Sequence, residues 1–167
     1  PASAGPHVVA HTVLAETVAA PTAGPQSGLS PVAISVQDAP AVTSARTTVP
    51  PFDYTLLDGT RYTSGTLRGR VVLVNFWATT CAVCVAEMPQ LVALHRVLAP
   101  RGLRTLAVAV RHDPPASVAR YAESRQLPFG VAIDNTGAIA SAFGEVEATP
   151  TTFLMDKRGR IDRRIVG

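Results

Sequence analysis

Hydrophobic and polar positions divide the chain into two unequal parts that meet near Val49. Beyond that point, short apolar runs alternate with segments in which apolar residues recur at helical spacing. The run "RVVLVNFW", residues 70–77, is typical of a central strand that is buried on both faces. Residues 52–63, "FDYTLLDGTRYT", predict a hairpin that turns at Asp58-Gly59. Further strands are predicted at 103–110, 129–134, 151–156 and 160–167, and helices at 82–100, 114–126 and 136–144.

This order of elements predicts an α/β domain. Strands that alternate with helices are joined by parallel crossovers, whereas the last two strands, separated by "KRG", form an antiparallel hairpin. The expected product is a mixed sheet with helices on its faces. Pro89 is expected to interrupt the first helix. No helix follows Gly167, so part of the sheet is expected to lack a cover.

Residues 1–48 differ from the rest in composition. They contain no aromatic residue, and their only charged residues are Glu16, Asp38 and Arg46. A segment so poor in large side chains cannot offset the entropy of ordering, so we expect a largely disordered tether kept extended by its prolines. Residues 49–167 then form one domain of ordinary size.

Charge and hydropathy exclude some classes of function. The chain of 167 residues has a formal charge of +3, carried by scattered arginines with one adjacent pair at Arg163 and Arg164. No basic stripe with interleaved aromatic residues is present, so we expect no nucleic-acid partner. No run of 18 apolar residues occurs, so no membrane-spanning segment is expected.

The candidate chemistry lies in "FWATTCAVCVAEMPQL", residues 76–91, which contains the only two cysteines. Cys81 and Cys84 lie at the predicted junction between a strand and a helix. Residues so spaced at a helix terminus have Cα atoms within the roughly 4.4–6.8 Å that a disulfide requires. The free N–H groups and the positive end of the helix dipole favour a thiolate there. A thiolate of low pKa attacks disulfides and also leaves readily, so this pattern favours a redox centre.

Three other interpretations of the cysteines are weaker. A zinc site needs four ligands, and the histidines are scattered at His7, His11, His95 and His112. A structural disulfide around two residues would remove little entropy from the unfolded chain. A pair of inert buried cysteines is not expected at a helix entrance. We therefore predict no metal and no cofactor.

Three stretches resemble the TlpA/ResA-like branch of the thioredoxin superfamily. They are "FDYTLLDGTRYTSGTLRGR" at 52–70, "VVLVNFWATTCAVCVAEMP" at 71–89 and "EATPTTFLMDKRGRI" at 147–161. The resemblance covers residues 49–167 and implies a three-layer α/β/α sandwich with a mixed central sheet and an N-terminal β-hairpin. It also implies an inserted helix and strand, which match residues 115–126 and 129–133. The terminal helix of this fold is absent from the chain.

The resemblance also implies roles for individual residues. Cys81 would be the attacking thiol and Cys84 the resolving thiol, which releases the partner from a mixed disulfide. Pro150 matches the cis-proline of the family, whose neighbouring backbone groups meet the partner chain. Thr149 precedes it and would shape access to the cysteines.

Two further residues have two interpretations each. Trp77 matches an aromatic residue near the site of family members, but a purely structural place in the core explains it equally well. Glu87 matches a family glutamate that would relay protons to Cys84, whereas its position early in a helix also suits a solvated carboxylate. The chain departs from the family at Thr80, where a tryptophan is common, and at Ala82 and Val83, which bring no charge between the cysteines.

The function implied by the resemblance is that of an extracytoplasmic thiol–disulfide oxidoreductase. It would reduce disulfides in partner proteins such as apocytochromes c (cytochrome c maturation), copper-site proteins or other envelope proteins, and a membrane electron donor would keep it reduced. The implied location is the periplasm or another extracytoplasmic space, with a membrane tether in a segment outside this chain. One alternative is a thiol peroxidase, which requires a threonine where Ala78 stands. Another is a Sco-like copper module, for which His112 is the candidate ligand.

Overall fold

The computed structural model describes residues 46–167. The predicted tether lies outside the described residues except for its last three. Those residues meet the turn that precedes the final strand: Thr48 forms a β-bridge with Arg160, and the N–H of Ile161 donates to the carbonyl of Thr47 at 2.8 Å. Pairing with the domain therefore begins slightly before the predicted boundary at Val49.

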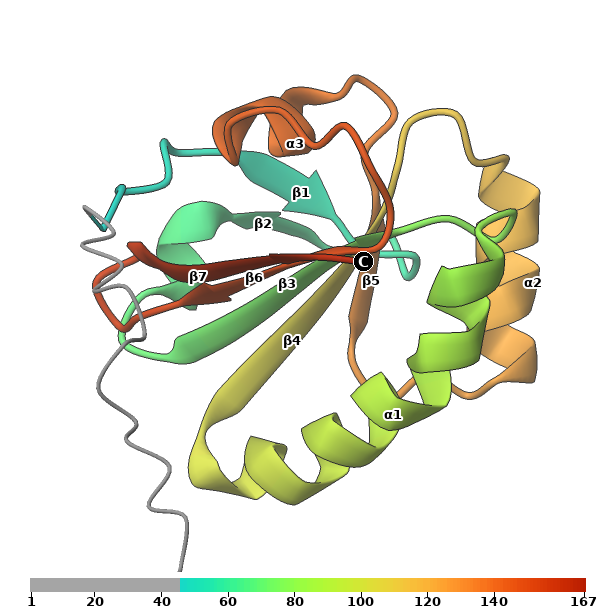
Figure 1. The fold of residues 1–167 in the computed structure, drawn as a ribbon, viewed down its shortest axis with the longest axis horizontal. Helices are drawn as coiled ribbons and strands as arrows, with labels where there is room; N and C mark the ends of the chain where they lie inside the picture. Colours follow the sequence, from blue (N-terminus) through green and yellow to red (C-terminus); the bar gives the residue numbers. More distant parts are fainter. Residues whose placement is uncertain (1–45) are drawn as a thin grey trace, which may run out of the picture. The chain divides into compact units, whose positions relative to one another are not determined.

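The domain is built on a mixed five-stranded sheet in the order β5-β4-β3-β6-β7 (Figure 1). Strand β3 pairs in parallel with β4, and β4 in parallel with β5, whereas β6 runs antiparallel to both β3 and β7. The strands of this sheet are β3 (Val71–Trp77), β4 (Leu103–Ala109), β5 (Gly130–Ile133), β6 (Thr151–Met155) and β7 (Ile161–Val166). The predicted mixed sheet with its terminal antiparallel hairpin is confirmed.

A small hairpin of β1 (Asp53–Thr55) and β2 (Arg61–Thr63) precedes this sheet. At its turn, Gly59 has a φ of +84°, which glycine adopts without strain, and the Asp58 carboxylate accepts from the N–H of Thr60 at 2.8 Å. The N–H of Leu57 donates to the carbonyl of Val131 at 3.0 Å. The hairpin is thereby attached to the edge strand β5.

Three α-helices cover the sheet, α1 (Ala82–Leu98) and α2 (Pro115–Ser124) on one face and α3 (Ala138–Ala142) with the hairpin on the other (Figure 1). Short 3-10 turns occur at Ser64–Leu67 and Ala99–Arg101, and the sequence pattern did not predict them as separate elements. Because side chains alternate along β3, Val72, Val74 and Phe76 join the hairpin-side core, while Trp77 joins the other. The structure is the predicted three-layer sandwich.

Helix α1 differs from its predicted form in two ways. It continues through Pro89, so the expected interruption is wrong: the ring costs a hydrogen bond, but Cys84 and Met88 hold the helix in the core. Among the described helices, the stretch Ala82–Arg101 is also long and apolar enough to cross a membrane, judged by length and composition alone. The sequence pattern had indicated no such segment. Since Cys84 and Met88 pack against the sheet, we describe the stretch as part of the domain.

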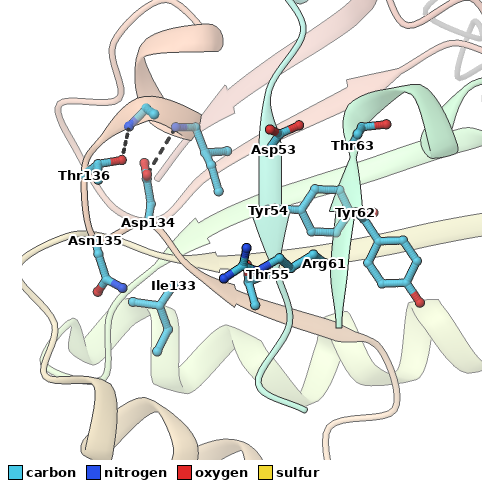
Figure 2. A pocket seen from close by; sticks show the side chains of 12 residues that line it. Asp53, Tyr54, Thr55, Arg61, Tyr62, Thr63, Ile133, Asp134, Asn135 and Thr136 are labelled. Carbon is cyan, nitrogen blue, oxygen red and sulfur yellow. Dashed lines mark hydrogen bonds between the residues drawn. The ribbon is translucent and has the colours of Figure 1, made fainter. Parts of the chain in front are cut away.

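Helix α3 begins at a buried carboxylate. Asp134, directly after β5, accepts from the N–H groups of Ile139 at 3.1 Å and Ala140 at 2.8 Å. Thr136 accepts from the N–H of Ala138 at 3.3 Å, and Figure 2 shows this contact and the one from Ile139 to Asp134 in the wall of a pocket beside the hairpin. Both acceptors satisfy N–H groups that a short helix leaves unpaired, so Asp134 has a structural role.

The turn between β6 and β7 predicts a pH-dependent contribution to stability. Asp156 accepts from the side chain of Arg160 at 2.8 Å and from the N–H groups of Arg158 and Arg160, and these bonds lower its pKa to about 2. A lowered pKa in the folded state stabilises the protein above the unfolded value of about 4, and this stabilisation is lost as the pH falls towards 2. Replacing Asp156→Asn should therefore lower the free energy of unfolding at pH 6 and make little difference near pH 2.

Urea unfolding of both proteins between pH 2 and pH 6 measures this difference. Asp53→Asn, which removes an exposed carboxylate from β1, is the control. A penalty for Asp156→Asn that stays constant over the whole range would contradict the assignment.

Candidate active site

The two cysteines form a disulfide at the start of α1. Strand β3 ends at Trp77, a short loop follows, and Cys81 is the N-cap of the helix. The Cα atoms of Cys81 and Cys84 are 5.2 Å apart, within the range predicted from their spacing. The backbone N–H of Cys84 donates to the Cys81 sulfur at 3.1 Å. In the reduced protein, this N–H and the positive end of the helix dipole stabilise negative charge on the same sulfur.

Exposure distinguishes the two sulfurs. Cys81 is half-buried, whereas Cys84 is only 3% exposed and lies in the core cluster between α1 and the sheet. No acidic residue occurs in the first turn of α1, so no carboxylate there opposes a thiolate. A partner can approach Cys81 from solvent, while Cys84 is almost fully buried beside it.

Thr149 and Pro150 lie next to the cysteines, although they are distant in sequence. Strand β6 pairs with β3 so that Thr151 lies opposite Phe76, which brings the loop before β6 to the end of β3. The carbonyl oxygen of Thr149 is 3.4 Å from the Cys81 sulfur. The peptide bond between Thr149 and Pro150 is cis, and Pro150 is buried. The structure thus places both predicted residues beside the predicted thiols.

A buried carboxylate supports the loop before Cys81, and the sequence pattern did not identify it. Asp113 is 1% exposed, and its carboxylate accepts from the N–H of Thr79 at 2.6 Å and from the Thr79 hydroxyl. Asp113 follows the end of β4, which lies beside β3, so the sheet brings the two residues together. The only signal in the sequence was an acidic residue shortly after the predicted strand 103–110, in "RHDPP", where His112 was the candidate residue.

Comparison with known proteins identifies the family. Residues 32–167 match the Redoxin family. The thiol–disulfide oxidoreductase ResA of Geobacillus thermodenitrificans is 37% identical over 120 residues, which are 72% of this chain and 68% of ResA. A putative thioredoxin from Neisseria meningitidis is 36% identical with a TM-score of 0.68, covering 73% of this chain and 81% of the other. A thiol:disulfide interchange protein from Chlorobium tepidum is 30% identical with a TM-score of 0.67, covering 73% and 86%.

The chain belongs to the redoxin family. Its ResA relatives and its Cys81–Cys84 pair make it a thiol–disulfide oxidoreductase, and its fold is thioredoxin-like. The enzyme class and the fold predicted from the sequence are therefore confirmed.

Trp77 of this oxidoreductase is a core residue in the structure. It has no exposed surface and packs in one cluster with Cys84. The centroids of the Trp77 and Tyr121 rings are 5.1 Å apart. Its indole N–H is buried and has no hydrogen-bond partner among residues 46–167. The side chain cannot contact a partner protein from this position, so the predicted substrate-binding role does not fit this state of the oxidoreductase.

Glu87 of the oxidoreductase is exposed and lines a groove of about 460 Å³. The groove lies between α1 and strands β3, β6 and β7. Cys84, Pro150 and Asn75 also line it, and the Asn75 amide donates to the Thr152 hydroxyl at 2.9 Å. The structure therefore brings Glu87 to the same groove as the resolving sulfur.

The described part of the oxidoreductase contains no cluster of side chains that could hold a metal ion. Within residues 46–167, no three His, Cys, Asp or Glu side chains lie close enough to hold a metal ion. His112 is exposed and lines a groove together with Thr149. Ala78, where a peroxidase would need a threonine, is buried.

Proposed function

We propose that this oxidoreductase acts as a reductase of disulfides in partner proteins outside the cytoplasm. The observation that carries the proposal is the pairing of an accessible sulfur at the helix entrance with a nearly buried one behind it. This arrangement suits attack on a bulky partner by Cys81 and subsequent closure by Cys84. The absence of other cysteines from the sequence and the resemblance to extracytoplasmic proteins support the location.

The reaction proceeds in two exchanges. The Cys81 thiolate attacks one sulfur of the partner disulfide; a bond forms between them, and the other partner sulfur leaves as a thiolate that takes up a proton. Cys84 then loses its proton and attacks the Cys81 sulfur, so that the Cys81–Cys84 disulfide forms and the second partner thiol leaves. Two electrons pass from the dithiol to the partner. A dithiol electron donor at the membrane would restore the reduced state.

Reduction potential and turnover test the direction of this reaction. We expect a potential near that of thioredoxin, about −270 mV, and reduction of insulin disulfides. A potential near −120 mV, typical of a strong oxidant, would overturn the reductase assignment. Rapid peroxide consumption or tight copper(I) binding without insulin reduction would instead favour the peroxidase or the copper module.

We further propose that Glu87 accepts the proton of Cys84 during the second exchange. The groove that Glu87 shares with Cys84 supports this role. Replacing Glu87→Gln should slow the second exchange near pH 7 by about tenfold, less than is usual for a positioned base because water also enters the groove. The deficit should shrink as the pH rises, because hydroxide in solution then removes the thiol proton without help from a carboxylate.

Quenched single-turnover reactions followed by mass spectrometry measure this step. Glu123→Gln, which removes an exposed carboxylate on α2, serves as the control. If the second exchange in the Glu87→Gln variant is as fast as in the wild type at every pH, Glu87 is only a solvated carboxylate.

A further inference from the structure

A second groove, of about 760 Å³, opens beside Thr149. Its walls are the residues after β4, including Arg111 and His112, then the start of α3, and finally the loop that carries Glu145 and Glu147. The groove lies at the carboxyl ends of the parallel strands β4 and β5, where open α/β sheets commonly bind ligands. Since the Thr149 carbonyl is 3.4 Å from the Cys81 sulfur, a polypeptide attached to that sulfur meets the mouth of this groove.

Two side-chain hydrogen bonds and two residues with positive φ shape the loop wall of the groove. Gly144 and Glu145 both have positive φ, 79° and 58°, and the second value is uncommon for a residue with a side chain. The Ser141 hydroxyl donates to the Glu145 carboxylate at 2.7 Å, and the Arg164 guanidinium donates to the Glu145 backbone carbonyl at 3.3 Å. These two contacts hold the turn that places Glu147 in the wall.

No ion pair within residues 46–167 involves Glu145, Glu147 or Arg111, although the Arg164 guanidinium lies on the backbone carbonyl of Glu145. Glu145 bonds through its carboxylate to a neutral hydroxyl. The wall that reaches Thr149 therefore carries two negative charges, and Arg111 stands among the residues after β4. This local charge is opposite in sign to the formal charge of +3 on the whole chain.

We propose that this groove docks the extended segment of a partner next to the attacked disulfide, and that Glu145 and Glu147 select segments containing lysine or arginine. The proposal rests on the proposed function, because it assumes that the partner disulfide reaches Cys81. Complementary charges near a reacting site speed encounter and exclude wrong partners, and salt screens the effect.

The test compares two peptides with the same internal disulfide, one flanked by three lysines and the other by three glutamates. The reduced Cys84→Ser variant forms a mixed disulfide at Cys81 with each, and mass spectrometry gives the second-order rate constants. Each rate constant is divided by the rate constant for the reaction of mercaptoethanol with the same peptide. This division removes differences in intrinsic reactivity between the two peptide disulfides. We expect the lysine peptide to react about threefold to tenfold faster at low salt, with a ratio close to one at 0.5 M salt.

Substitutions of charged residues show which side chains cause the preference for the lysine peptide. Glu147→Lys should bring the ratio to one or below, and Arg111→Glu should increase it. Glu123→Lys, which makes the same charge change on α2, should leave the ratio unchanged. If the Glu147→Lys variant does not fold, the ratio can be measured with Glu147→Gln, which makes a smaller change in charge.

Two results would overturn the proposal: a ratio that Glu147 substitutions do not alter, or a faster reaction with the glutamate peptide, as the net charge alone predicts. The trapping step measures chemical exchange at Cys81 and does not depend on turnover. A wild-type protein that fails to reduce insulin would therefore refute the proposed function, while the trapping ratio would still decide the role of the groove.

Discussion

Replacing Cys84→Ser is expected to convert turnover into a stable covalent complex between Cys81 and the partner. Cys84 lies beneath Cys81 with a Cα separation of 5.2 Å, so its attack is an intramolecular step that external thiols replace poorly. Because such steps benefit from very high effective concentrations, turnover should fall at least about 1,000-fold. Non-reducing gels and mass spectrometry of the trapped complex measure the result.

The opposite substitution is the control for these roles. Cys81→Ser removes the accessible sulfur and leaves one that is 3% exposed, so it should give neither turnover nor a trapped partner. A complex that forms through Cys84, with none through Cys81, would show that the two roles are reversed.

Replacing Asp113→Ala is expected to weaken both the fold and the exchange reaction. The substitution leaves the N–H and hydroxyl of Thr79 without their buried acceptor, which should lower the free energy of unfolding by about 2–3 kcal/mol. The loop before Cys81 also loses its anchor, and small displacements of a reacting group are costly, so exchange with a partner should slow by about tenfold or more. Rates measured at a pH where the Cys81 thiol is fully ionised separate this effect from the loss of a nearby charge.

A second buried aspartate provides the matched control. Asp134 is 3% exposed and also accepts two hydrogen bonds, but they lead to α3 rather than to the cysteine loop. Asp134→Ala should therefore cost a similar free energy of unfolding without slowing exchange between Cys81 and a small disulfide such as that of mercaptoethanol, which does not occupy the groove beside α3. Equal rate losses in the two variants would indicate general loosening of the domain instead of a specific support for Cys81.

The elements and the cysteine centre could be predicted because their signals are local. The Asp58-Gly59 turn, the apolar run of β3 and the spacing of Cys81 and Cys84 each lie within a few residues of one another. The mixed character of the sheet followed from the alternation of strands and helices and from the terminal hairpin, whereas the order of its strands was not predicted. Pro150 entered the predictions only through the family resemblance, since a single proline does not reveal its isomer.

Contacts between distant residues could not be predicted in this way. The bond from Thr79 to Asp113 spans 34 positions and that from Asn75 to Thr152 spans 77, and no periodicity connects either pair. The continuation of α1 through Pro89 depends on packing of Met88 against the sheet, which outweighs the local preference. The exposure of Glu87 and the burial of Trp77 likewise follow from how α1 and β3 lie in the assembled domain.

The position of the single tryptophan gives the protein an internal optical probe. Trp77 shares a packed cluster with Cys84 and is shielded from water, so its emission reports on the cysteine pair rather than on solvent. A neighbouring disulfide quenches indole fluorescence, and opening that bond should brighten it. Stopped-flow fluorimetry can therefore follow each electron-transfer cycle without any added dye.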